Sequence, residues 1–215
     1  MELFLDTANI EEIKEGMASG LITGVTTNPA IVAKEGRNFD ALLTEILSLT
    51  EGPVFAEVLS LDTENMVLEG KKLHAFNPRM VVKIPATWAG MQAVHHLNRA
   101  GVHTAVTLVY SPAQAMMASV AGADYVAPFL GRAYDVGIDG FESLRQISKQ
   151  FCAQKVKTKI LAASVRTAQD AWNAAMCGAD ILTMTLKVIK QMAWHPQTDV
   201  TLQAFLNEWK KIENL

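Results

Sequence analysis

The chain alternates short apolar runs with longer amphipathic stretches along its whole length. The short runs are rich in branched side chains and predict strands, while apolar positions three and four residues apart predict helices. The predicted strands lie near Glu2–Leu5, Gly24–Thr26, Val54–Val58, Met80–Ile84, His103–Thr107, Tyr125–Pro128, Lys159–Ala163 and Ile181–Met184. The helical patterns between them include Phe39–Leu49, Thr63–Phe76, Gly90–Ala100, Ser111–Ala121, Gly140–Phe151 and Thr167–Met176. The sequence is therefore a succession of strand–helix units.

This alternation predicts a single α/β domain over residues 1–215 with the (β/α)8 TIM barrel fold. A similar motif occurs twice, as Gly-Ala-Asp-Tyr-Val at 122–126 and Gly-Ala-Asp-Ile-Leu at 178–182. In each copy we expect the glycine to end a helix just before the next strand. Eight strands, each followed by a helix, close into such a barrel. A doubly wound open sheet is the alternative. Its dinucleotide-binding form requires GxGxxG after an early strand, and the sequence has no such motif.

A further amphipathic stretch follows the eighth strand, beyond what a barrel requires. Thr198 and Asp199 are the predicted caps of a C-terminal helix over residues 198–215. Its apolar side chains fall on one side, at Leu202, Phe205, Leu206, Trp209 and Ile212. Because this stripe arrives after the helical ring has closed, we expect it to pack on a neighbouring subunit. A helix folded back over its own barrel is the alternative.

One lysine stands inside an apolar strand, in the stretch Met80-Val81-Val82-Lys83-Ile84-Pro85. Alternation along a strand puts Val81 and Lys83 on one face and the other two branched residues on the opposite face. Burial disfavours the charged ammonium, and a neutral, positioned amine is the nucleophile that forms Schiff bases with carbonyl substrates. The other reading is a strand-end lysine whose head reaches solvent. The hexapeptide alone leaves both open.

Polar residues follow most of the predicted strands, and in a barrel the carboxyl ends of the strands carry the chemistry. These residues are Asp6, Thr26, Thr27, Asn28, Glu57, Lys83, Thr107, Arg132, Ser164 and Arg166. Singly, each has a structural explanation, such as a helix cap or a solvated charge. Together they place a lysine, two carboxylates, hydroxyls and two arginines at one mouth, which favours a catalytic Lys83.

Composition and charge narrow the possible partners. The net charge of −3, with both signs well mixed, gives no basic footprint for nucleic acid. No apolar run reaches membrane-spanning length, and Met1–Asp6 reads as a strand and not as a signal peptide. Cys152 and Cys177 read as reduced thiols of a cytoplasmic protein, and the five histidines have no metal-binding spacing. We therefore expect no metal, nucleic-acid or membrane partner.

A set of motifs runs nearly from end to end and is highly specific as a group. They are Phe4-Leu5-Asp6-Thr7-Ala8-Asn9, Gly24-Val25-Thr26-Thr27-Asn28-Pro29, Val82-Lys83-Ile84-Pro85, Ser111-Pro112-Ala113-Gln114-Ala115, Tyr125-Val126-Ala127-Pro128-Phe129-Leu130-Gly131-Arg132 and Ala162-Ala163-Ser164. Together they resemble the transaldolases, specifically the short-chain branch that includes the fructose-6-phosphate aldolases. The resemblance implies a (β/α)8 barrel without metal or cofactor and a Schiff-base lysine at the position of Lys83. It also implies homo-oligomers, with rings of five that often pair into decamers.

The resemblance also implies a role for each site residue. Lys83 attacks the ketone of a keto-sugar phosphate, and Glu57 moves protons through a water held with Thr107. Asp6 takes the proton from the hydroxyl next to the bond that breaks. The remaining residues are assigned to substrate binding: Thr26 and Asn28 to the hydroxyls of the three-carbon enamine, Phe129 to the site wall, and Arg132, Ser164 and Arg166 to the phosphate. The 184–186 loop, Met-Thr-Leu, lacks glycines for a backbone phosphate cradle.

Four positions divide between the two activities of this branch. Glu57 and Phe129 resemble transaldolases, whereas the aldolase relatives carry Gln and Tyr there. Ala105 and Ala127 resemble the aldolases, whereas transaldolases carry Asn and Ser. The favoured expectation is a transaldolase of the pentose phosphate pathway that uses sedoheptulose 7-phosphate or fructose 6-phosphate. The alternatives are a fructose-6-phosphate aldolase that releases dihydroxyacetone and, less favoured, a non-catalytic sugar-phosphate-binding barrel.

Overall fold

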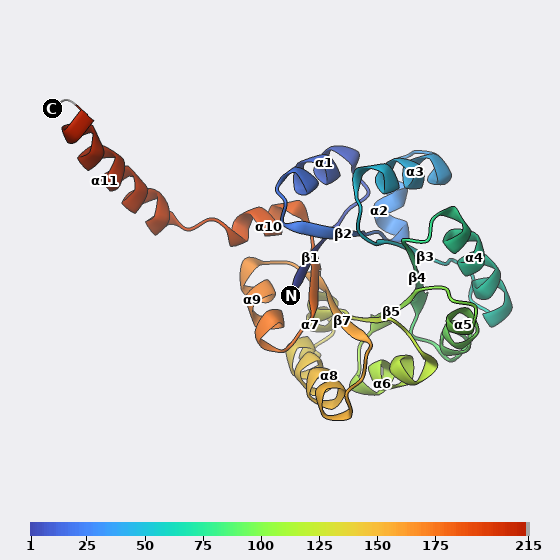
Figure 1. Ribbon diagram of the computed structural model, residues 1–215. Coiled ribbons are helices and arrows are strands. Elements are labelled where there is room, and N and C mark those ends of the chain that lie inside the picture. Colours follow the sequence, from blue (N-terminus) through green and yellow to red (C-terminus); the bar gives the residue numbers. More distant parts are fainter. Residues whose placement is uncertain (214–215) are drawn as a thin grey trace.

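Parallel strands close into a barrel in the computed structural model, which describes residues 1–213 (Figure 1). Its eight strands in this range are β1 (Glu2–Asp6), β2 (Ile22–Thr26), β3 (Val54–Glu57), β4 (Met80–Pro85), β5 (Thr104–Val109), β6 (Tyr125–Pro128), β7 (Lys159–Val165) and β8 (Ile181–Met184). Each strand pairs in parallel with its neighbours in chain order, and β1 pairs with β8. The fold is the predicted (β/α)8 barrel, and the open-sheet alternative is excluded.

Helices follow the strands and form an outer ring around the barrel, except the last helix, which projects away from it (Figure 1). They are α1 (Ile10–Ala18), α2 (Pro29–Lys34), α3 (Phe39–Leu49), α4 (Thr63–Phe76), α5 (Trp88–Arg99), α6 (Pro112–Ala121), α7 (Leu130–Asp135), α8 (Gly140–Gln154), α9 (Ala168–Met176), α10 (Leu186–Met192) and α11 (Pro196–Glu213). The side chains of Asn9, Asp62 and Thr87 accept hydrogen bonds from the first turns of α1, α4 and α5. These caps explain why each helix begins directly after its loop.

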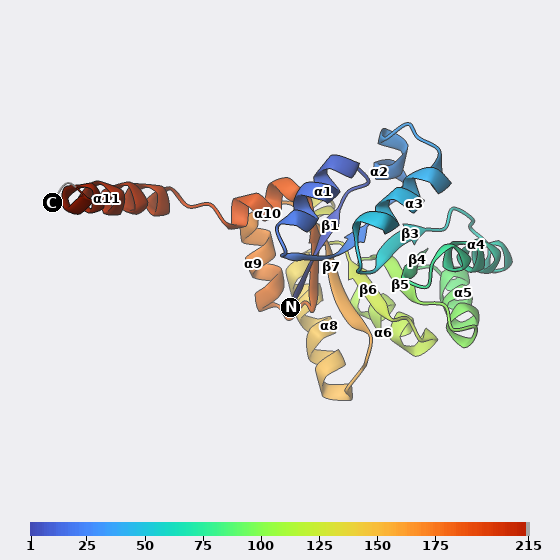
Figure 2. The ribbon, with the colours of Figure 1, turned by 45° about the horizontal axis from the view of Figure 1, so that its top comes forward.

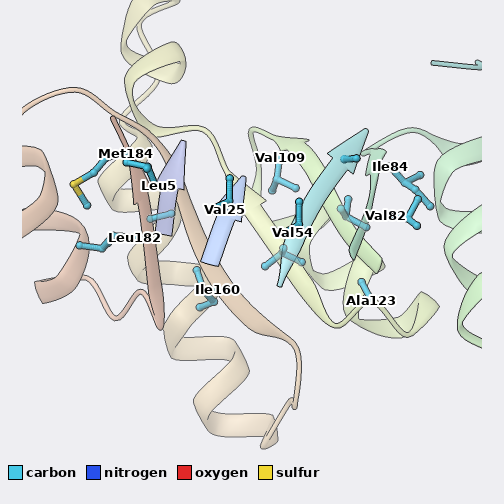
Figure 3. Packing of buried hydrophobic residues seen from close by; sticks show 14 of the residues in the cluster. Leu5, Val25, Val54, Val82, Ile84, Val109, Ala123, Ile160, Leu182 and Met184 are labelled. Carbon is cyan, nitrogen blue, oxygen red and sulfur yellow. The ribbon is translucent and has the colours of Figure 1, made fainter. Parts of the chain in front are cut away.

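The two faces of most strands belong to two separate apolar clusters. Val82 and Ile84 point outward and pack with helix residues in the larger cluster, and Figure 3 shows members of this layer on several strands. Val81 points inward to a smaller cluster inside the barrel. In that cluster the Phe55 ring lies 5.6 Å from Phe4 and 5.1 Å from Tyr125, measured between ring centroids. This inner cluster fills the lower part of the barrel and supports the residues above it.

The observed element bounds differ from the predicted ones mainly at strand ends. β5 and β7 continue two residues beyond their predicted ends, to Val109 and Val165. The short helices α2, α7 and α10 were not predicted, because six or seven residues carry too little periodicity. The predicted caps Thr198 and Asp199 are wrong: α11 begins at Pro196, a residue whose fixed φ suits the first helical turn. Residues 214–215 of the predicted helix lie outside the described residues.

Helix α11 projects away from the barrel in both views (Figures 1 and 2). A short segment after α10 connects it, and the helix does not fold back onto the helical ring. Its apolar side chains are exposed, with Phe205 at 68% and Trp209 at 58%. The alternative in which this helix covers its own barrel is therefore not the arrangement in this structure.

Candidate active site

The strand alternation that buries the inner cluster also builds the layer above it. Two residues further along a strand, the same face is presented again. Phe4 is thus followed by Asp6, Phe55 by Glu57, and Val81 by Lys83. The barrel interior consequently changes from apolar to polar within one step, at the carboxyl ends of the strands.

These inward residues surround a cavity of about 120 Å³. Its lining residues are Asp6, Thr26, Asn28, Lys83, Thr107, Ala127, Phe129, Leu161, Ala163, Ser164, Thr183 and Arg132. Strands β1, β2, β4, β5 and β8 contribute polar side chains to the lining, whereas β6 and β7 contribute mostly apolar ones. The cavity therefore has Asp6 and Lys83 on its polar side and a small hydrophobic surface on the other, with Arg132 of α7 beyond that surface.

Lys83 is buried, with 6% of its surface exposed. Its Nζ donates to the carbonyl oxygen of Thr27 at 2.9 Å and lies 3.1 Å from Oε2 of Glu57. The carboxylate is distant in sequence, but β3 and β4 are adjacent and pair Glu57 with Lys83 in register. The reading of a lysine head that reaches solvent is thus wrong. No acid lies beside Lys83 in sequence, and the neighbouring strand supplies one.

Asp6 lies on the same cavity wall. Its Oδ1 accepts a hydrogen bond from Oγ1 of Thr26 at 2.8 Å, across the register pair between β1 and β2. Burial raises the pKa of Asp6, and this effect exceeds the opposing influences of Lys83, the Thr26 hydrogen bond and Arg132, in that order. A carboxyl whose pKa is raised by burial is a stronger base than one on the surface. This property suits an acid–base role.

Thr107 contributes an unsatisfied hydroxyl to the cavity. The residue is fully buried, and among residues 1–213 its Oγ1 has no hydrogen-bond partner. A buried hydroxyl without a partner costs about 1–3 kcal/mol. Such groups are uncommon in folded proteins, so a hydroxyl that faces a cavity marks a position for a bound polar group.

A break in strand alternation brings two consecutive residues of β7 to the cavity. Ala163 and Ser164 both line it, although regular alternation would turn one of them away. The register between β7 and β8 shifts between Ala162 and Val165, and Ser164 has φ 57°. This local irregularity places the Ser164 side chain at the cavity rim, as such features often do near functional sites.

The two predicted arginines have different surroundings. Arg132 lines the cavity, with its guanidinium carbon 5.7 Å from the Phe129 ring centroid. Arg166 is not part of that lining, and its two terminal nitrogens donate to the Asp135 carboxylate at 2.7 and 2.6 Å. Its side chain crosses Gly131, where a Cβ would lie 2.6 Å from Nε of Arg166. Arg132 is thus the guanidinium at the cavity, and Arg166 joins the end of β7 to α7.

Asn28 has a structural task as well as a place in the cavity wall. Its Oδ1 accepts from the backbone nitrogen of Ile31 at 3.0 Å and caps α2. Because the carbonyl oxygen is committed to the helix, the side-chain nitrogen is the group that Asn28 can offer to a ligand.

Eight of the ten predicted site residues therefore line one cavity. Glu57 adjoins it through its contact with Lys83, while Arg166 is displaced toward Asp135. Sequence reasoning missed Thr183, which lines the cavity from β8. The signal was present, since Thr183 is two residues after the inward Ile181, but the residue lies inside the strand and not after its end. Each assigned role stays a prediction.

Within residues 1–213 no group of three or more His, Cys, Asp or Glu side chains is placed to hold a metal ion. No helix in the same part of the chain has the length and apolar character that crossing a membrane requires.

Comparison with known proteins gives a consistent result. The family model described as Transaldolase/Fructose-6-phosphate aldolase matches residues 3–215. A protein named probable transaldolase from Carboxydothermus hydrogenoformans is 47% identical over 213 residues, covering 99% of this chain and 100% of the relative. Another of that name from Halalkalibacterium halodurans is 48% identical over 209 residues, covering 97% and 99%.

A solved structure supports the fold alone. Thiamine phosphate pyrophosphorylase from Pyrococcus furiosus superposes with a TM-score of 0.57 at 17% sequence identity, covering 86% of this chain and 85% of that one. The family match over nearly the whole chain is the decisive finding. This chain belongs to the transaldolase/fructose-6-phosphate aldolase family.

Proposed function

We propose that the protein is a transaldolase that transfers a dihydroxyacetone unit from a ketose phosphate to an aldose phosphate through a Schiff base on Lys83. The donor is sedoheptulose 7-phosphate or fructose 6-phosphate, as in the pentose phosphate pathway of the cytoplasm. The observation that carries the proposal is a buried lysine at one cavity, with the carboxylate of Asp6 in the cavity lining and that of Glu57 3.1 Å from the lysine nitrogen. A site that only binds sugar phosphates has no need of a buried amine.

The first stage forms the imine. The neutral amine of Lys83 attacks the ketone carbon C2, and the oxygen leaves as water to give a protonated imine. Glu57, whose Oε2 is 3.1 Å from Nζ, is placed to move the protons of this dehydration. The Thr107 hydroxyl, which has no hydrogen-bond partner within residues 1–213, lines the same cavity and can position the water that carries them.

The second stage breaks the carbon–carbon bond. Asp6 takes the proton of the C4 hydroxyl, the C3–C4 electron pair moves into the C2–C3 bond, and C4 leaves as an aldehyde. The electrons neutralise the iminium and leave an enamine on Lys83. An acceptor aldehyde then reverses these steps: the enamine carbon attacks it, Asp6 returns the proton to the new hydroxyl, and water releases the product from Lys83.

The phosphate binds at the rim of the cavity. Arg132 lies there, and Ser164 adds a hydroxyl from the irregular end of β7. A guanidinium forms paired, charge-assisted hydrogen bonds with phosphate oxygens. Arg166 contributes only if it shares or releases its contact with Asp135.

The alternative activity is a fructose-6-phosphate aldolase, in which the enamine is protonated and dihydroxyacetone is released. Ala127 in the cavity wall and Ala105 beneath Thr107 favour it, because transaldolases carry polar residues at both positions. Phe129 favours transfer, since it offers no hydroxyl as a proton donor.

We expect transfer from fructose 6-phosphate to erythrose 4-phosphate to be faster than cleavage without an acceptor. Phe129→Tyr should lower the ratio of transfer to cleavage. Equal rates with and without acceptor would make the protein an aldolase.

Borohydride reduction in the presence of fructose 6-phosphate, followed by peptide mass analysis, tests the common chemistry. The proposal requires a mass increase on the peptide that contains Lys83, and its loss in Lys83→Ala. Arg37→Ala is a matched control, because Arg37 is a cation that pairs with Glu45 on the surface. Trapping that maps elsewhere would sink the assignment, and binding without trapping would indicate the non-catalytic barrel.

The same proposal includes a homo-oligomer, with α11 packed on a neighbouring subunit. The exposed apolar stripe of α11 and its projection away from the barrel support this arrangement (Figure 2). A pentamer or a decamer is the expected assembly from the family resemblance.

A further inference from the structure

A line of three polar side chains crosses the barrel mouth from β8 to β1. Oγ1 of Thr183 lies 2.6 Å from Oγ1 of Thr26, which in turn lies 2.8 Å from Oδ1 of Asp6. Both threonines are buried, at 3% and 2% exposure. The strands come in the order β8, β1, β2, so the Thr183–Thr26 contact passes across β1, which carries Asp6.

The donors in this line are fixed by the number of protons. An ionised carboxylate can only accept hydrogen bonds, so Thr26 donates its single hydroxyl proton to Asp6. The Thr26 oxygen is then free to accept, and Thr183 must donate to it. The order is therefore Thr183 to Thr26 to Asp6, and each hydrogen bond polarises the next one. This arrangement favours the ionised form of the carboxylate.

The line also distinguishes the two oxygens of Asp6. Thr26 occupies Oδ1, while among residues 1–213 no hydrogen bond to Oδ2 is present. Oδ2 is therefore the oxygen placed to receive a proton from the substrate. The hydrogen bond at Oδ1 also limits rotation of the carboxylate and so sets the direction in which Oδ2 points.

We propose that Thr183 is a positioning residue for Asp6, acting through Thr26 to hold the carboxylate as the anion with Oδ2 toward the substrate. In terms of the reaction the role rests on the proposed function, since Asp6 must be ionised to take the C4 hydroxyl proton. The effect of Thr183 on the ionisation of Asp6 depends only on the two hydrogen bonds that connect them.

Two cations near Asp6 also favour its ionised form. Lys83 on β4 and Arg132 on α7 both lower the pKa of Asp6, and burial raises it further than they lower it. Glu57 on β3 pairs with Lys83 at 3.1 Å, and its negative charge partly cancels the effect of that ammonium on Asp6. The hydrogen bond from Thr26 also lowers the pKa of Asp6, so the threonine line offsets part of the burial effect that the nearby cations leave uncompensated.

Thr183→Val is the direct test, because it replaces the hydroxyl by a methyl group of similar size. We expect kcat/KM for transfer to fall about tenfold, as for a weakened hydrogen bond to a charged group. The acidic limb of its pH profile should move to higher pH, since Asp6 then holds its proton more tightly. Borohydride trapping of dihydroxyacetone on Lys83 should be unchanged, because imine formation does not use Asp6. Thr183→Ser should restore both rate and profile.

Thr104→Val is the matched control. Thr104 is equally buried on β5, its hydroxyl has no partner within residues 1–213, and it is not among the residues that line the cavity. This variant should leave the rate and pH profile as they are. A Thr183→Val enzyme with an unshifted profile, or with trapping reduced as much as turnover, would overturn the proposal.

A readout without turnover separates this inference from the proposed function. The Asp6 carboxyl carbon can be titrated by ¹³C NMR in substrate-free protein and assigned with Asp6→Asn. Thr183→Val should raise the pKa of Asp6, whereas Thr183→Ser and Thr104→Val should not. A protein that gives no borohydride adduct but shows this shift would refute the transaldolase mechanism and keep the threonine line. An unchanged titration in Thr183→Val refutes the line.

Discussion

At the residue scale, the two arginines are separated by their surroundings. Arg132 lines the cavity, whereas Arg166 already holds a carboxylate. A charged hydrogen bond contributes about 1.5–3 kcal/mol, so Arg132→Ala should raise KM for fructose 6-phosphate at least about tenfold. It should change little for unphosphorylated dihydroxyacetone as donor. Arg166→Ala should have the smaller effect of the two. Steady-state kinetics with both donors check this, and an equal loss on both donors would show that Arg132 is structural.

Asp6 also links activity to stability at this scale. Its pKa in the folded state is raised by burial, so between the unfolded and folded values the folded protein binds more protons. Stability therefore falls as pH rises through that window. Asp6→Asn should raise Tm at neutral pH, and the gain should vanish below the pKa of the unfolded carboxyl. Transfer should fall by about 10²–10⁴-fold, because the proton acceptor is lost. Calorimetry across pH tests the sign: a lower Tm at neutral pH contradicts it.

At the scale of elements, α7 and the end of β7 touch through a glycine. A Cβ at Gly131 would lie 2.5 Å from the carbonyl oxygen of Ser164, a backbone atom that cannot move alone. Gly131→Ala should therefore destabilise the protein by about 1–3 kcal/mol. It should also raise KM for phosphorylated donors, because it displaces Ser164 and the Arg166 side chain. Denaturant unfolding and kinetics give the two numbers.

Gly137→Ala, just after the same helix, is the comparison for Gly131→Ala. Gly137 has φ 76° with no atom near the added methyl, so only backbone strain of about 1 kcal/mol is expected. This variant should lose stability but keep its KM. If both variants move KM alike, the effect comes from loosening α7 and not from the contact with β7.

Element scale is also where prediction from sequence succeeded and failed. Alternation predicted that Lys83 shares a face with Val81, because side chains two residues apart on a regular strand point to the same side. It did not predict that Glu57 lies 3.1 Å from Lys83, since that contact depends on strand register. The irregular end of β7 at Ser164 and the Arg166–Asp135 pair arise from local backbone geometry, which side-chain pattern does not encode.

At the scale of the whole molecule, the exposed apolar stripe of α11 is the feature to explain. A fully buried Phe or Leu side chain stabilises by about 1.5–3 kcal/mol, so several exposed on one helix favour association. Barrel closure does not involve α11, since β1 pairs with β8 before the helix begins. Folding of the barrel and assembly of the proposed oligomer are therefore separable, and a change on the stripe should affect assembly first.

Phe205→Glu and Asn207→Glu test this with one added charge each. Phe205 lies on the apolar stripe and is 68% exposed, whereas Asn207 lies about 200° further around the helix. If the proposed pentamer or decamer forms through this stripe, light scattering should give a smaller particle for Phe205→Glu and an unchanged mass for Asn207→Glu. Removing residues 196–215 should give the same small particle, with a barrel that keeps its circular dichroism. An oligomer of unchanged mass after that truncation would mean that other surfaces hold the subunits together.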